Sequence, residues 1–104
     1  MEQAVIVHLR LSDGAFGSCE ERRALFDLEE QLESAIAAAG VGEFDGDEFG
    51  EGECVLYMYG PQADQLWAVV EPVLGACPCA SSGYAIKRYG EATDVSAQVI
   101  PVAW

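Results

Sequence analysis

The amino-acid sequence predicts an α+β domain of the ferredoxin-like, split βαβ kind, in which two helices cover one face of an antiparallel sheet. Three observations support this class. The periodic segments run in the order strand, helix, strand, strand, helix, strand. They fit into 104 residues, close to the commonest size of one domain. Hydrophobic residues make up 51% of the chain, enough to form a core. We therefore expect a single domain over residues 1–104.

The first strand is expected at residues 4–11, and the first helix follows it. Within the strand, Val5, Val7 and Leu9 alternate with His8 and Arg10. Because side chains of a strand point alternately to its two faces, the apolar set should meet the helices. His8 and Arg10 should then lie on the opposite face.

The first helix is expected to begin after Ser18 and to stop at Gly40. Ser18 and Glu21 have the spacing of a capping box. Apolar residues then recur on one helical stripe, at Leu25, Leu28, Leu32, Ile36 and Ala39. Glycine commonly ends a helix in the left-handed conformation, which suits Gly40.

A hairpin is expected at residues 41–49 and 53–60, joined by a Gly-Glu-Gly turn. Its first arm is acidic and rich in glycine, which suits an edge strand. Its second arm, ECVLYMYG, has the strongest strand pattern of the chain. Leu56 and Met58 should enter the core, which places Tyr57 and Tyr59 on the opposite face.

The second helix is expected from Pro61, with Pro72 ending or kinking its last turn. Its apolar stripe comprises Ala63, Leu66, Trp67, Val70 and Leu74. A short strand is expected at residues 84–89. Residues 94–102 are β-prone and predict an extra C-terminal strand, which Pro101 restricts to an edge or a tail.

This arrangement predicts an open sheet face that carries tyrosines and basic residues. If Ile86 enters the core, the fourth strand adds two residues to those of the first and third. The expected set is His8, Arg10, Tyr57, Tyr59, Lys87 and Tyr89. Tyrosine and arginine are enriched at binding surfaces. Such a face can bind a ligand, pair with a second copy of the chain, or be covered by the C-terminal strand.

The charge is strongly asymmetric. Eighteen acids against five Lys and Arg residues give a net charge of −13, and no Lys or Arg occurs between Arg23 and Lys87. Six acids lie within eleven residues: Glu43, Asp45, Asp47, Glu48, Glu51 and Glu53. This surface should repel nucleic acids and anionic membranes. It should attract a basic protein partner, or else serve only as a solvated, solubilising face.

Neither a metal site nor a cofactor site is predicted. The acidic hairpin places Asp45 and Asp47 at the first and third positions of a calcium loop. Phe49 and Leu56 fall at its fifth and twelfth positions, where oxygen ligands are needed. The Cys77-Pro-Cys79 segment resembles half of a zinc site. The remaining candidate ligands, Cys19, Cys54 and His8, are not expected to converge on it.

No catalytic set is predicted, and the chain is expected in the cytoplasm. His8 is the only histidine, and the sequence places no nucleophile beside it. The longest aliphatic runs span four or five residues, at 4–7 and 35–39, too short for a membrane span or a signal peptide. In the cytoplasm all four cysteines should be thiols, and Pro78 disfavours a bridge between its two neighbours.

Three segments carry a resemblance to known sequences: GEFDGDEF at 42–49, LYMYGP at 56–61 and EPVL at 71–74. On these segments the chain resembles a group of small acidic bacterial proteins that have a ferredoxin-like domain and no assigned function. The resemblance covers residues 25–90. It implies a bacterial, cytosolic, single-domain protein and supplies no catalytic residues.

Two functions are compatible with the sequence. The first is a non-enzymatic interaction or regulatory module, similar in size and charge to inhibitor and immunity proteins. It would pair with itself through the tyrosine-bearing face and with a basic protein through the acidic hairpin. The second is a small-molecule-binding domain or small enzyme, in which Arg10 holds an anion and His8 exchanges a proton beside Tyr57 and Tyr59.

Overall fold

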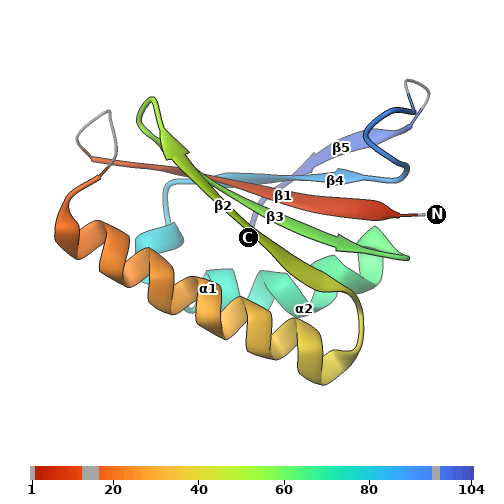
Figure 1. Ribbon diagram of the computed structural model, residues 1–104, viewed down its shortest axis with the longest axis horizontal. Helices are drawn as coiled ribbons and strands as arrows, with labels where there is room; N and C mark the ends of the chain where they lie inside the picture. The colour runs from red at the N-terminus through yellow and green to blue at the C-terminus, as the bar shows by residue number, and fades with distance from the viewer. Residues whose placement is uncertain (1, 13–16, 95–96) are drawn as a thin grey trace.

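The structure, a computed structural model, describes residues 2–12, 17–94 and 97–104. Its elements are β1 (Gln3–Arg10), α1 (Cys19–Ala39), β2 (Glu43–Gly50), β3 (Glu53–Gly60), α2 (Ala63–Gly75), the 3-10 turn η1 (Pro78–Ala80), β4 (Tyr84–Arg88) and β5 (Val99–Val102). The strands form one antiparallel sheet in the order β2-β3-β1-β4-β5. Both helices lie on the same side of this sheet (Figure 1). The predicted α+β class is confirmed, and the fifth strand, β5, lies at the edge of the sheet beyond β4.

The core lies between the helices and the inward side chains of the two central strands, β1 and β3. Val5, Val7 and Leu9 of β1 are at most 1% exposed, and Leu56 and Met58 of β3 are fully buried. The register of these strands predicted from alternation is therefore confirmed. Each of these side chains stabilises the fold by roughly 1.5–3 kcal/mol through its removal from water.

The predicted limits of α1 are confirmed by its caps. The Ser18 hydroxyl accepts a hydrogen bond from the Glu21 N–H, and the Glu21 carboxylate accepts one from the Ser18 N–H, both at 3.1 Å. The same carboxylate accepts bonds from the hydroxyl and N–H of Ser12, at 2.6 and 3.0 Å. These bonds, with the Ser12 hydroxyl first, lower the pKa of Glu21 to about 2. Gly40 closes the helix with φ 66°.

The second half of the chain differs from the prediction at two points. The helix α2 begins at Ala63 rather than Pro61, and the Gln3 side chain accepts a hydrogen bond from the Ala63 N–H at 2.7 Å. Pro72 lies inside α2, which continues to Gly75.

The loop after α2 contains η1, which the sequence did not predict. The predicted C-terminal strand is present as β5, and it pairs with β4 at the edge of the sheet, as Pro101 predicted. Residues 95–96 of the predicted segment 94–102 lie outside the described residues.

A close backbone approach joins the start of β2 to the end of β3. At Gly60, an added Cβ would overlap the carbonyl oxygen of Val41. The carbonyl oxygen of Val41 is a backbone atom, and the added Cβ would be fixed to the backbone of Gly60. Neither atom can move aside unless a strand shifts.

We therefore predict that Gly60→Ala lowers the free energy of unfolding by about 1–3 kcal/mol, the usual cost of overpacking. Gly75→Ala is the matched control, because a Cβ there meets no atom within 4 Å. It should leave stability unchanged or raise it by less than about 1 kcal/mol. Urea unfolding measures both variants, and equal stability of the two would contradict the steric argument.

Candidate functional site

The sheet surface opposite the helices (Figure 1) is here called the open face. It carries three rows of side chains across β3, β1 and β4. Residues paired across antiparallel strands point to the same face and form one row. The rows are Tyr59–Ala4–Arg88, Tyr57–Ile6–Ile86 and Val55–His8–Tyr84. Arg10, the last residue of β1, pairs with Glu53, the first residue of β3. The structure thus brings together four of the predicted residues, His8, Arg10, Tyr57 and Tyr59.

In the first row, the side chains of Arg88 and Tyr59 meet over β1. The Arg88 guanidinium lies 6.0 Å from the centre of the Tyr59 ring. The two side chains flank Ala4, which is fully buried although it points away from the helices. The Arg88 Nε also donates to the carbonyl of Gly90 at 2.7 Å. The hydrogen bond to Gly90 and the cation–π contact with Tyr59 therefore fix the orientation of the Arg88 guanidinium.

The third row contains the only histidine of the chain. The His8 ring stacks on Tyr84 with centroids 4.7 Å apart and planes 4° apart. Its Nδ1 is buried without a hydrogen-bond partner and lies 3.5 Å from a carboxylate oxygen of Glu53. When His8 is protonated, this contact is an ion pair with Glu53.

Two predicted members of the open face lie on the other side of the sheet. Lys87 pairs with the buried Val5, and its Nζ contacts Asp64 of α2 at 2.9 Å. The Tyr89 hydroxyl donates to the same Asp64 oxygen. These bonds, with that from Tyr89 first, lower the pKa of Asp64. The placement of Lys87 and Tyr89 on the open face was wrong, because β4 turns Ala85 rather than Ile86 toward the helices.

The opposite parity of β4 brings three other residues to the open face. Tyr84, Ile86 and Arg88 take the places expected for Lys87 and Tyr89. Ala85 and Ile86 are both apolar, so the sequence of β4 did not decide which of them enters the core; in the structure Ala85 does, and it is fully buried. Tyr84 remains 46% exposed, so the face presents an accessible aromatic ring.

The acidic residues of the β2–β3 hairpin lie at the edge of the sheet, as β2 is a terminal strand. Five of the six are exposed: Glu43, Asp45, Asp47, Glu48 and Glu51. Glu53 is partly buried beside His8. A bulge between Phe44 and Gly46 shifts the register of β2, and Asp47 then pairs with the buried Leu56. Asp47 therefore points toward the helix layer, whereas Glu48 points to the open face.

Asp47 forms a small carboxyl group cluster with Glu29 of α1. Partial burial, followed by the neighbouring Asp47, raises the pKa of Glu29 to about 8. Burial, followed by the charges of Glu29 and Asp47, raises the pKa of the Cys54 thiol to about 12. Glu29 therefore holds its proton at neutral pH, and Cys54 is a core thiol.

The structure pairs two cysteines that the sequence predicted as thiols. Cys77 and Cys79 form a disulfide, with Cα atoms 5.4 Å apart, whereas Cys19 and Cys54 are free. The prediction was wrong because η1 folds this segment into a tight turn. The turn brings the two Cα atoms within the 4.4–6.8 Å range, roughly, that a bridge requires. Among the described residues, no group of three or more His, Cys, Asp or Glu side chains could hold a metal ion.

A hollow of about 520 Å³ lies where β3 ends. Its lining comprises Glu2, Gly40, Gly42, Glu43, Tyr59, Gly60 and Pro61. It shares Tyr59 with the open face, but His8, Arg10 and Tyr57 do not line it. The four residues of the predicted small-molecule site thus share a face without sharing this hollow.

Comparisons with known proteins assign no family. A scan against protein-family models found no model that matches the chain, and a search of curated proteins found no match. In the described part of the chain, neither helix has the length and apolar character needed to cross a membrane. The cytoplasmic location and bacterial origin remain predictions.

We predict that Glu29 makes the fold less stable as pH rises. Its pKa is about 8 in the folded chain against 4.5 as the ordinary value. Between these values the folded state binds more protons, so its stability falls as pH increases from 4.5 toward 8. Glu29→Gln should remove this loss and raise the melting temperature at pH 8–9 more than at pH 5.

Glu30→Gln is the matched control, since Glu30 is the exposed neighbour of Glu29 on α1. It makes the same carboxyl-to-amide replacement without touching Asp47. Thermal unfolding followed by circular dichroism from pH 4 to pH 9 measures both variants. The same pH dependence in wild type and Glu29→Gln would show that Glu29 ionises normally in the fold.

Proposed function

We propose that this chain is a non-enzymatic binding domain, a ferredoxin-like unit extended by β5, which forms a homodimer through its open face. One observation carries the proposal. The rows over β3, β1 and β4 form an ordered surface of aromatic and aliphatic side chains, and both helices lie on the other side. Tyrosine and arginine anchors around an apolar centre are typical of protein interfaces.

The open face has a suitable size for a second copy. Five strands about 4.8 Å apart, with central strands of eight residues that rise ~3.3 Å each, span roughly 24 × 26 Å. This gives a flat area of about 600 Å², before the relief of the side chains is counted. A standard interface buries about 800 Å² per partner, so two open faces can form one.

The charges on this face also favour a second copy. Arg10 and Arg88 are two of the five Lys and Arg residues in the chain, and both lie on the open face. Glu48 and Glu53 lie on the same face, toward β2. A face that carries both signs can be complementary to itself under twofold symmetry. When two copies approach through other surfaces, the net charge of −13 of each chain opposes their contact.

We propose a basic protein as a second partner, bound by the acidic hairpin. The support is its position, because β2 is an edge strand and its hairpin carries exposed carboxylates. Acidic clusters of this kind steer basic partners and speed their association. Asp47 points toward the helix layer and Glu51 lies in the turn between β2 and β3, so these carboxylates stay accessible to a basic partner when a second copy covers the open face.

A small-molecule site on the open face is the alternative function. The proximity of His8 to Glu53, and the position of Arg10 on the same face, support it. In this function Arg10 would hold an anion while His8 exchanged a proton. Binding would then need the face to stay open, whereas dimerisation would cover it. The oligomeric state therefore separates the two functions.

We predict that Tyr57→Asp weakens dimerisation at least tenfold. Tyr57 lies in the middle row beside Ile6, and a carboxylate there would be buried without a partner in the dimer. Sedimentation equilibrium measures the dissociation constant, and far-ultraviolet circular dichroism confirms that the variant folds.

Phe26→Asp is the matched control, because Phe26 is a 50% exposed aromatic residue on α1, in the helix layer. It changes charge and size in the same way but should leave dimerisation unaltered. A wild-type chain that stays monomeric at millimolar concentration would refute the proposed self-association.

For the acidic hairpin, we predict that binding to a basic partner depends on the position of the carboxylates more than on the total charge of the chain. Asp45→Asn with Glu51→Gln should weaken binding to a lysine-rich peptide and flatten its salt dependence. The control, Glu30→Gln with Glu33→Gln, removes the same charge from α1 and should bind like wild type. Equal loss in both double variants, measured by fluorescence anisotropy, would exclude a dedicated hairpin site.

A further inference from the structure

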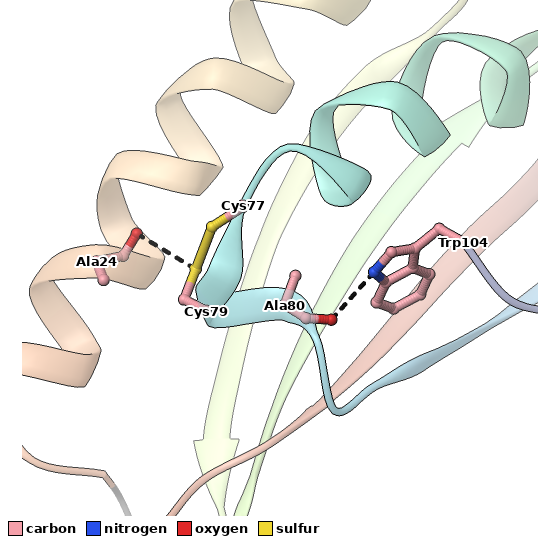
Figure 2. Close-up of a disulfide and its surroundings, with 5 residues drawn as sticks. All are labelled: Ala24, Cys77, Cys79, Ala80 and Trp104. Atoms are coloured by element: carbon pink, nitrogen blue, oxygen red, sulfur yellow. Dashed lines mark hydrogen bonds between the residues drawn. A yellow bond between two sulfur atoms is a disulfide. The ribbon is translucent and has the colours of Figure 1, made fainter.

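The Cys77–Cys79 disulfide lies on the surface turn η1, between α2 and β4. Figure 2 shows the bridge beside α1, with the Trp104 indole on the other side of the turn. The two cysteines are partly buried, and only Pro78 separates them in the sequence. This bridge plays no part in the open face or in the acidic hairpin.

The turn is already held without the bridge. The Ala80 N–H donates to the Cys77 carbonyl at 3.0 Å, and the Ser81 N–H donates to the Pro78 carbonyl at 3.3 Å. Ala80 is fully buried, and its carbonyl accepts a hydrogen bond from Trp104 Nε1 at 3.0 Å. A bridge across so short a loop removes little conformational entropy from the unfolded chain. The disulfide therefore has little to contribute as a structural cross-link.

The two sulfur atoms have different surroundings. Cys77 lines a hollow of about 330 Å³, whose lining is uncharged: Leu74, Gly75, Ala76, Cys77, Pro78, Ser81 and Trp104. Cys79 does not line this hollow and faces α1 instead, with its Sγ 4.0 Å from the Ala24 carbonyl oxygen (Figure 2). A thiol can thus approach Cys77 from the hollow. The Ala24 carbonyl stands ready to accept a hydrogen bond from a Cys79 thiol.

We propose that Cys77–Cys79 is a thiol–disulfide exchange site whose substrates are dithiols. A thiolate of the dithiol attacks the Cys77 sulfur, the Cys77–Cys79 bond breaks, and its electron pair leaves on Cys79, which takes up a proton. The second thiol of the dithiol then attacks the mixed disulfide and releases Cys77 as a thiol. The chain gains two electrons and two protons, and the dithiol is oxidised to its own disulfide.

Exchange at this site should change the surroundings of Trp104, which follows β5. Ala80 follows Cys79 directly and anchors Trp104, which lies 6.2 Å from Trp67, ring centre to ring centre. Cys77 and Trp104 line the same hollow, so conversion of the bridge to two thiols changes the surroundings of the indole even while the turn keeps its hydrogen bonds. Indole emission therefore reports the redox state of the bridge.

The test uses the full-length chain, equilibrated with defined ratios of reduced and oxidised dithiothreitol, quenched with acid and alkylated. Mass spectrometry then counts the labelled cysteines. We expect Cys77 and Cys79 to be labelled together at reducing ratios and protected together at oxidising ratios, reversibly. Cys19, which is free and exposed, should be labelled at every ratio. A bridge that stays closed, or stays open, over the whole range would overturn the proposal.

Cys77→Ser and Cys19→Ser form a matched pair of variants. Reduction should change the tryptophan emission of wild type and of Cys19→Ser, but not that of Cys77→Ser. An emission change in Cys77→Ser, or no change in wild type once labelling shows the bridge is open, would refute the link between bridge and Trp104. The labelling experiment on wild type does not depend on how well the variants fold.

Discussion

Both helices pack on one side of the sheet, and the alternation of strand side chains then determines the rest of the molecule. On β1, every residue beneath the helices is flanked by residues that face the other way. The complete burial of Val5 and Val7 therefore requires Ile6 and His8 to lie on the open face. The strands β3 and β4 pair with β1, so their side chains also alternate between the helix side and the open face. The tyrosines and arginines of the open face are thus a direct consequence of the packed core.

The sheet separates its charges in a way that suits two kinds of contact. Its acidic residues gather on the edge hairpin, whereas Arg10 lies on the central strand β1 and Arg88 on the next strand, β4. Cation–π contact with Tyr59 and the bond to Gly90 hold Arg88 in place before any partner arrives. A face ordered in advance loses little side-chain entropy on association, which favours binding between rigid surfaces.

The sequence predicted most of the fold because several signals agreed. For α1 the capping box, the apolar stripe and Gly40 pointed to the same limits, and for β3 the alternation was unambiguous. For β4 the signal failed: in five residues, Ala85 and Ile86 offered one apolar side chain to each face, and the larger one was assigned to the core. In the structure the space beneath α2 takes the smaller residue, so Tyr84 and Arg88 joined the site in place of Lys87 and Tyr89. The disulfide was missed because it depends on η1, a short 3-10 turn that the sequence did not predict.

Hydroxyl-radical footprinting at low and high protein concentration shows whether two open faces bury each other. The account predicts that Tyr57, Tyr59 and Tyr84 become protected from oxidation as concentration rises. Tyr89, which lies on the helix side beside Asp64, should react equally at both concentrations. Unchanged reactivity of all four tyrosines, or protection of Tyr89 alone, would contradict the account.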